Sequence, residues 1–207
     1  MNTFIKLISG ISILLFTCKN IQPNNKQDFT LLHQPVRNDT ITKLELSTRE
    51  LRSNVIPDSI FTMTNLKYLS ITGMDCDFRL TDKNGNNVTQ CWVLEKIPSG
   101  IAKLSNLETL SLTLNGVQRL PNEICSLQKL KTLDLTDNVA LSDINVITKL
   151  SNLENLYLFG CYLEELPPDI GKLKRLKELG LTGNQLSTEE IKRIKLALPT
   201  CHIVYTP

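Results

Sequence analysis

The strongest constraint on the fold is a leucine pattern that recurs every 23 residues. Leu107, Leu130, Leu153 and Leu176 are spaced by that interval, and each is followed by Leu three and five positions later. The eighth position after each of them is polar or Cys, and its occupants are Asn115, Asn138, Cys161 and Asn184. One such unit is too short to bury its own apolar side chains, so the pattern predicts units that stack into a solenoid.

Two weaker copies precede the four regular ones. Ile41, Leu44 and Leu46 form one copy, with Arg49 at the Asn position, and Leu66, Leu69 and Ile71 form the other, with Met74 at that position. We therefore predict six repeats, followed by a C-terminal cap, over residues 41–207.

Each unit has two parts with different local signals. The alternation Leu110-Ser111-Leu112 predicts a short strand with one buried face. The Asn that follows is expected to satisfy backbone groups where the chain leaves the strand. The second part, such as Leu120-Pro121-Asn122-Glu123-Ile124, predicts a short helix with Pro at its first position.

These phrases, L-x-x-L-x-L-x-x-N/C and L-P-x-x-I-x-x-L, resemble bacterial leucine-rich repeats and the Ras-group and plant-like repeats. The resemblance covers residues 41–207. It implies an α/β solenoid, a right-handed superhelix with a parallel concave β-sheet and short convex helices. The resemblance says almost nothing about function. Because the solenoid would offer a concave sheet with outward side chains in rows, our leading hypothesis is a non-catalytic module that binds a protein or a glycan through that face.

The last repeat is followed by signals for a cap. Ser187 and Glu190 have the spacing of a capping box, and Ile191, Ile194 and Leu198 would line one helix face. Residues 201–205 then predict a final strand that closes the sheet.

The second repeat carries an insertion of 18 residues, because Leu66 and Leu107 are 41 residues apart. Asn84-Gly85 is a strong turn signal between β-prone segments, so we predict a hairpin over about residues 75–95. Cys76 and Cys91 would face each other near its base. A disulfide fits an exported protein, and two free thiols are the alternative in a reducing compartment.

The N-terminus has the pattern of an export signal. Residues 1–17 contain Lys6 and a short apolar run, which is typical of a signal peptide. Leu15-Phe16-Thr17-Cys18 resembles the lipobox of bacterial lipoproteins, which implies a lipid on Cys18 and a location in the cell envelope. The alternative is an ordinary cleaved signal with an unmodified Cys. Residues 18–40 are rich in Asn, Gln and Lys and predict a flexible tether.

Composition argues against several functions. The net charge is only +2 and the Lys and Arg residues are scattered through the repeats, so we expect no basic stripe and no nucleic-acid partner. The only histidines, His33 and His202, are far apart in the pattern, and no metal cluster, cofactor motif or catalytic set is recognisable. We expect a monomeric protein that is not an enzyme.

The outward strand positions are the expected ligand-binding surface. Most carry small polar residues, and the exceptions that could contact a ligand are Tyr68, Asp134, Tyr157, Phe159 and Glu178. Exposed aromatic side chains are enriched at interfaces, although lateral packing against neighbouring strands would explain Tyr157 and Phe159 equally well.

Two other functions remain open. The repeats could form an intracellular Ras-group-type scaffold, in which Cys18 carries no lipid, or a secreted effector or adhesin that acts on a host partner. The hairpin around Trp92, rather than the sheet, could also be the contact surface.

Overall fold

The computed structural model describes residues 7–8, 11–12 and 41–206, and divides the chain into two units at residue 36. In the first unit, β1 (Leu7–Ile8) and β2 (Ile11–Ser12) pair antiparallel. Cys18 and the predicted tether lie outside the described residues. Within the described part of the chain, no helix is long and apolar enough to cross a membrane.

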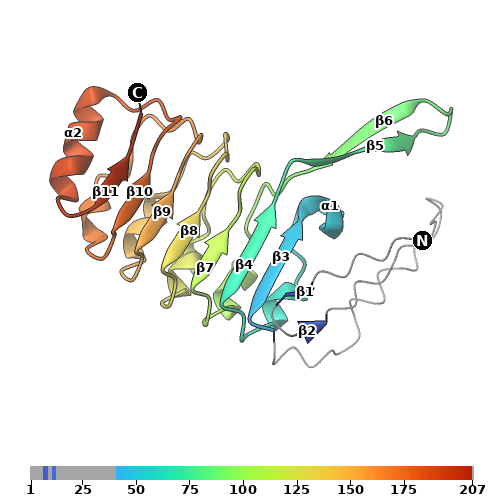
Figure 1. The fold of residues 1–207 in the computed structure, drawn as a ribbon, viewed down its shortest axis with the longest axis horizontal. Helices are drawn as coiled ribbons and strands as arrows, with labels where there is room; N and C mark the ends of the chain where they lie inside the picture. Colours follow the sequence, from blue (N-terminus) through green and yellow to red (C-terminus); the bar gives the residue numbers. More distant parts are fainter. Residues whose placement is uncertain (1–6, 9–10, 13–40, 207) are drawn as a thin grey trace. The chain divides into compact units, whose positions relative to one another are not determined.

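The second unit is built on one open, parallel, seven-stranded sheet (Figure 1). The strands are arranged in chain order, with only the hairpin strands left out of the series. They are β3 (Lys43–Ser47), β4 (Tyr68–Thr72), β7 (Thr109–Ser111), β8 (Thr132–Asp134), β9 (Asn155–Tyr157), β10 (Glu178–Gly180) and β11 (His202–Val204). The predicted repeats and closing strand therefore form one continuous sheet.

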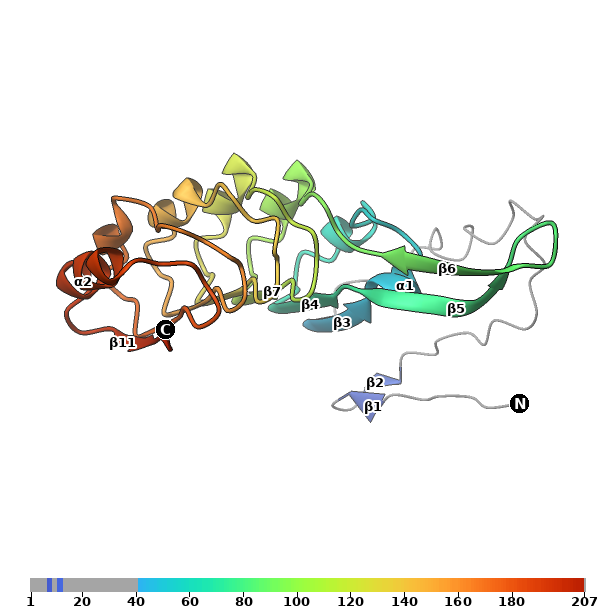
Figure 2. The same ribbon diagram turned by 90° about the horizontal axis from the view of Figure 1, so that it is seen from above.

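Short 3₁₀ helices cover one face of the sheet (Figure 2). We call the other, uncovered face the outer face. They are η3 (Ile60–Thr62), η4 (Ser99–Lys103), η5 (Asn122–Ser126), η6 (Asn145–Lys149) and η7 (Ile170–Lys172). Pro98 and Pro121 lie one position before their helices in extended conformation, not at the first helical position that we predicted. Their carbonyl oxygens accept the first helical hydrogen bonds, from the N–H groups of Ile101 and Ile124.

The core lies between the sheet and these helices. The repeat leucines fill it, and Leu133 and Leu156 are fully buried, as the strand pattern predicts. Ile124 and Leu127 face inward from the helical side in the same way. Burial of one full leucine side chain contributes about 2 kcal/mol, so stability is spread over the whole stack.

A column of buried polar side chains joins the repeats where the chain leaves the strands. Asn138 accepts a hydrogen bond from Val117 N–H (3.0 Å) and donates to the carbonyl oxygens of Leu112 and Leu135 (both 2.8 Å). Cys161 occupies the equivalent place, and its thiol donates to Leu135 O (3.2 Å). The predicted function of this position is confirmed, since each side chain satisfies backbone groups of the preceding repeat.

The N-terminal repeat ends differently from the pattern. Arg49, which we placed at the Asn position, lies instead in the short helix α1 (Thr48–Leu51). Ser47 and Glu50 form a complete capping box at its start, with bonds of 3.2 and 2.7 Å. This helix takes the place of the Asn turn, and Arg has no acceptor for the backbone hydrogen bond that Asn accepts in the regular repeats.

The C-terminal cap is α2 (Thr188–Ala197), which buries Ile191 and Ile194. Ser187 caps it by accepting from Glu190 N–H (3.1 Å), but the reciprocal half of the predicted capping box is absent. The Glu190 carboxylate instead accepts from Leu166 N–H (2.8 Å) and pairs with Arg193 (2.6 Å). It therefore ties the cap to the last repeat.

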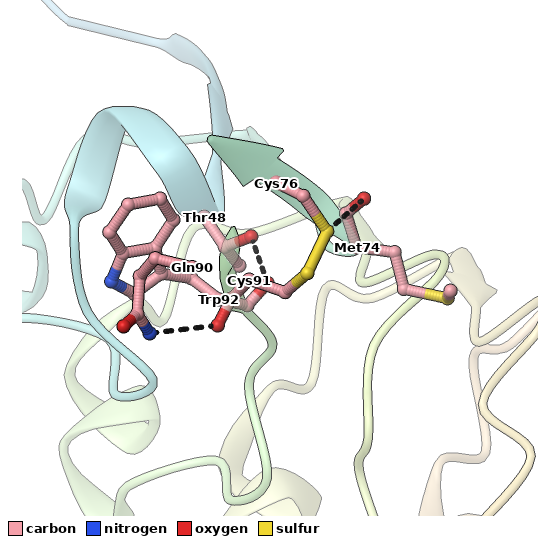
Figure 3. Close-up of a disulfide and its surroundings, with 6 residues drawn as sticks. All are labelled: Thr48, Met74, Cys76, Gln90, Cys91 and Trp92. Atoms are coloured by element: carbon pink, nitrogen blue, oxygen red, sulfur yellow. Dashed lines mark hydrogen bonds between the residues drawn. A yellow bond between two sulfur atoms is a disulfide. The ribbon is translucent and has the colours of Figure 1, made fainter. Parts of the chain in front are cut away.

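The insertion forms the antiparallel hairpin β5 (Asp75–Thr81) and β6 (Asn87–Trp92), which extends from the end of β4 beside α1 (Figure 1). Cys76 lies directly opposite Cys91, and the structure joins the two by a disulfide (Figure 3). The buried Thr48 hydroxyl donates to Trp92 O (2.6 Å) and fixes the hairpin base to α1.

Candidate binding surface

The outward side chains form straight rows across the outer face of the sheet, because the strands pair in register. One row is Tyr68, Thr109, Thr132, Asn155 and Glu178, and the next is Ser70, Ser111, Asp134, Tyr157 and Gly180. Most of these positions are small and polar. The row pattern places Asp134, Tyr157 and Glu178 on neighbouring strands.

Tyr157 and Phe159 form a stacked aromatic pair on this face. Their ring centroids are 5.9 Å apart and their planes differ by 14°. Both side chains are partly exposed. Tyr157 is the one aromatic residue among the outward positions of β7 to β10, and Phe159 follows it two positions later.

Phe159 occupies space that a side chain at Gly180 would need. A Cβ on Gly180 would lie 2.2 Å from Phe159 Cζ, well inside contact distance. The glycine on β10 is therefore the reason that the ring can lie across the neighbouring strand. Sequence analysis missed Gly180 as part of the site, although it is the one glycine in the row of Ser70, Ser111, Asp134 and Tyr157.

The charge around Tyr157 is negative. Burial raises the pKa of its hydroxyl above the ordinary value, and the nearby carboxylates of Glu178 and Asp134 raise it further. Asp134 also accepts a hydrogen bond from Thr136 N–H (3.0 Å). Among the described residues, neither carboxylate forms an ion pair. The surface therefore offers two unneutralised carboxylates beside an aromatic ring.

Tyr68 is separate from this cluster, because β7 and β8 lie between β4 and β9. Its ring already holds a cation, since Lys43 Nζ lies 4.7 Å from the ring centroid. Lys43 also pairs with Glu45 (3.1 Å). The predicted site residues thus form two groups. At Tyr68 the protein's own Lys43 already contacts the ring and pairs with Glu45, whereas no cation of the described residues pairs with the carboxylates near Tyr157.

No group of three or more potential metal ligands occurs in the part of the chain that the structure describes. The stacked repeats, the sheet register and the exposed outward rows are those of a binding scaffold. The leucine-rich repeat region model matches residues 44–198, so the chain belongs to the leucine-rich repeat family. No curated protein matches it.

Solved structures support the same fold. A leucine-rich repeat protein of Leptospira interrogans is 27% identical with a TM-score of 0.62, over 79% of this chain and 36% of that one. The Arabidopsis receptor kinase HAESA, solved with the peptide hormone IDA and the co-receptor SERK1, is 27% identical with a TM-score of 0.52, over 77% of this chain and 24% of that one. The leucine-rich repeat domain of the type III effector XopL is 26% identical with a TM-score of 0.54, over 74% of this chain and 57% of that one. This chain therefore spans less than two thirds of the length of each of these three proteins.

Proposed function

We propose that this protein is a non-catalytic binding module that holds a protein ligand on the outer face of its sheet. In this proposal a basic side chain of the ligand lies against Tyr157, between Asp134 and Glu178. The observation that carries the proposal is the combination of a partly exposed aromatic pair with two carboxylates that lack a cation among the described residues.

The chemistry of the surface favours a positively charged contact. A Lys or Arg side chain within about 6 Å of an aromatic ring is attracted by the ring electrons. Two neighbouring carboxylates add attraction and also orient the incoming charge. The protein's own Lys43 makes the same kind of contact with Tyr68, beside Glu45, at the other end of the sheet.

We further propose that the module is a lipoprotein of a bacterial cell envelope, anchored through Cys18. The support is the sequence pattern of residues 1–18 and the resemblance of Cys18 and its neighbours to a lipobox. Several acyl chains on one residue would give a stable anchor where a single chain would give a marginal one. The Cys76–Cys91 disulfide is compatible with an oxidising compartment.

A phage-displayed random peptide library tests the ligand chemistry directly. The full chain carrying Cys18→Ser, which removes the proposed lipid, serves as the immobilised target. Enriched peptides should contain Lys or Arg. Glu178→Gln should weaken their binding roughly two- to fivefold, as expected for a partly exposed charge pair. Glu45→Gln is the matched control, because Glu45 lies on the same face and is already paired with Lys43.

Other results would overturn the proposal. Enriched peptides without basic residues would contradict the cationic contact. Equal loss of binding for Glu178→Gln and Glu45→Gln would show that only the overall charge matters. Failure to enrich any peptide, combined with binding to a glycan array that depends on Tyr157, would replace the protein ligand by a sugar.

A further inference from the structure

The cations of the repeats converge on one edge of the solenoid, where the strands begin (the lower edge of the sheet in Figure 1). The segments that lead into β4, β7, β8, β9 and β10 place exposed Lys and Arg side chains there, and we call this surface the basic edge. It comprises Lys67, Lys103, Lys129, Lys131, Lys149, Lys172, Lys174, Arg175 and Lys177. The prediction that the chain has no basic stripe was wrong, because residues far apart in sequence occupy matching places in successive repeats.

The carboxylates within these segments are neutralised by the edge's own lysines. Glu108 pairs with Lys131 (2.8 Å) and more loosely with Lys67 (3.8 Å), and Glu154 pairs with Lys177 (2.6 Å). These ion pairs hold the pKa values of both Glu side chains below their ordinary value. The two acids therefore link repeats without giving the edge a negative region.

Of the remaining cations of the edge, Lys172 pairs with Asp169, and the others form no ion pair with a residue in the described part of the chain. Lys129 and Arg175 bond to neutral amides, at Asn106 Oδ1 (2.7 Å) and Asn152 Oδ1 (2.8 Å). With Lys131 they line a shallow hollow of about 270 Å³. Lys149 and Lys174 are exposed and form no ion pair with any residue in the described part of the chain.

The opposite edge, where the strands end, carries a net negative charge outside the hairpin. Its cations are Arg49, Arg52, Lys96 and Arg119, whereas its carboxylates are Glu50, Glu95, Asp137, Asp143, Glu164 and Glu165. A protein with a formal net charge of only +2 thus separates its charges across the width of the sheet. Such a separation orients the molecule on a charged surface, whereas scattered charge would not.

The described solenoid also begins on the basic edge. The Thr42 carbonyl accepts hydrogen bonds from the N–H groups of Lys67 (2.8 Å) and Tyr68 (3.0 Å). Lys67 O accepts from Glu108 in the same way, and this series of bonds continues to Lys177 O. Thr42 is therefore the first member of the row that contains Lys67 and Lys131. The segment that leads back to Cys18 joins the solenoid at this row.

We propose that the basic edge docks on an anionic phospholipid surface. The connection toward Cys18 at this edge makes a membrane the favoured anionic partner, and one lipid-bearing residue together with a basic patch gives two membrane signals. The proposal rests in part on the proposed anchor, but its chemistry is independent of the lipid. It can therefore be tested on protein that carries Cys18→Ser.

The experiment measures binding of the full chain with Cys18→Ser to vesicles of phosphatidylglycerol and phosphatidylcholine by co-sedimentation at low salt. Because the full chain keeps the apolar run within residues 1–17, which can bind neutral lipid by itself, the expected result is tighter binding to these vesicles than to vesicles of phosphatidylcholine alone. Each basic side chain near an anionic surface strengthens binding about fivefold. Lys149→Glu/Lys174→Glu should therefore lower the partition coefficient about 25-fold or more. Glu154→Gln should raise the partition coefficient, because it removes a negative charge that pairs with Lys177 on the basic edge.

The matched control is Lys96→Glu/Arg119→Glu, which makes the same change in charge on the opposite edge. It should lower the partition coefficient far less. Equal loss in both double variants would overturn the basic edge as the docking surface, and so would absence of wild-type binding to the anionic vesicles. Tight binding to duplex DNA without binding to vesicles would replace the lipid surface by a nucleic acid. If the protein binds anionic vesicles but Cys18 of the wild-type protein proves to carry no lipid, the basic edge stands as a docking surface and the proposed lipid anchor is contradicted.

Discussion

The Phe159 ring lies in the space above Gly180, with its Cζ atom 2.2 Å from the position that a Cβ on Gly180 would take. Gly180 ends β10, and Phe159 lies two residues beyond the end of the neighbouring strand β9. Because Gly180 has no side chain, the Phe159 ring can occupy the space above it. The same ring stacks on Tyr157. The geometry of the proposed contact surface therefore depends on a glycine in the sheet.

Gly180→Ala should displace the Phe159 ring. The clash involves the far end of a side chain that can rotate, so we expect a modest loss of stability, about 1 kcal/mol. In the Phe159→Ala background the same substitution should cost nothing or should stabilise, because Ala suits a strand better than Gly. Urea unfolding of the two single variants and the double variant measures this coupling. Strictly additive effects would show that the two residues do not interact.

Substitutions in the core should lower stability more strongly. Leu133→Ala and Leu156→Ala should each lower the free energy of unfolding by roughly 2–5 kcal/mol, because both side chains are fully buried and leave cavities. Leu196→Ala on α2 is the control, since that side chain is 83% exposed. Thermal melts for the core variants that coincide with wild type would contradict the strand register.

The sequence predicted the repeating parts of this fold well and its exceptions poorly. A period of 23 residues determines which leucines face the core, and the structure buries Leu133 and Leu156 accordingly. Arg49 was assigned wrongly, because the Ser47–Glu50 capping box starts a helix there. Glu190 was assigned wrongly, because its carboxylate accepts a hydrogen bond from Leu166 in the preceding repeat. The contact of Phe159 with Gly180 and the basic edge were missed for the same reason, since lateral neighbours become visible only once the strands are in register.

The thiol of Cys161 should be inert in the folded protein. Burial raises its pKa to about 11, so its thiolate population near pH 8 should be about 100-fold below that of an ordinary thiol. Iodoacetamide at pH 8 should label the partly exposed Cys125 first and Cys161 only after unfolding. Because the neutral thiol is favoured in the folded state, this contribution to stability should be lost as the pH rises from about 9 toward 11. Equal labelling of Cys125 and Cys161 by mass spectrometry would contradict their different burial.

The proposed anchor predicts a change in cellular fractionation. Cys18→Ser should release the protein from the bacterial membrane fraction or stall its processing, because the acyl chains would have no attachment point. Incorporation of radiolabelled palmitate into wild type but not into Cys18→Ser is the direct measurement. Unchanged mass and membrane partition in the variant would favour an ordinary signal peptide or an intracellular scaffold.

The measurement that tests the central claim most directly is the affinity of a library-selected basic peptide for the wild-type chain, Tyr157→Ala and a chain lacking residues 79–89. Truncation of a true anchor residue costs about 2 kcal/mol or more, so Tyr157→Ala should weaken binding about thirtyfold with little change in melting temperature. Thr109→Ala, two strands away on the same face, and the shortened hairpin should both bind as wild type does. Loss of binding on hairpin deletion, with full affinity retained by Tyr157→Ala, would contradict the account and move the site from the sheet to the hairpin.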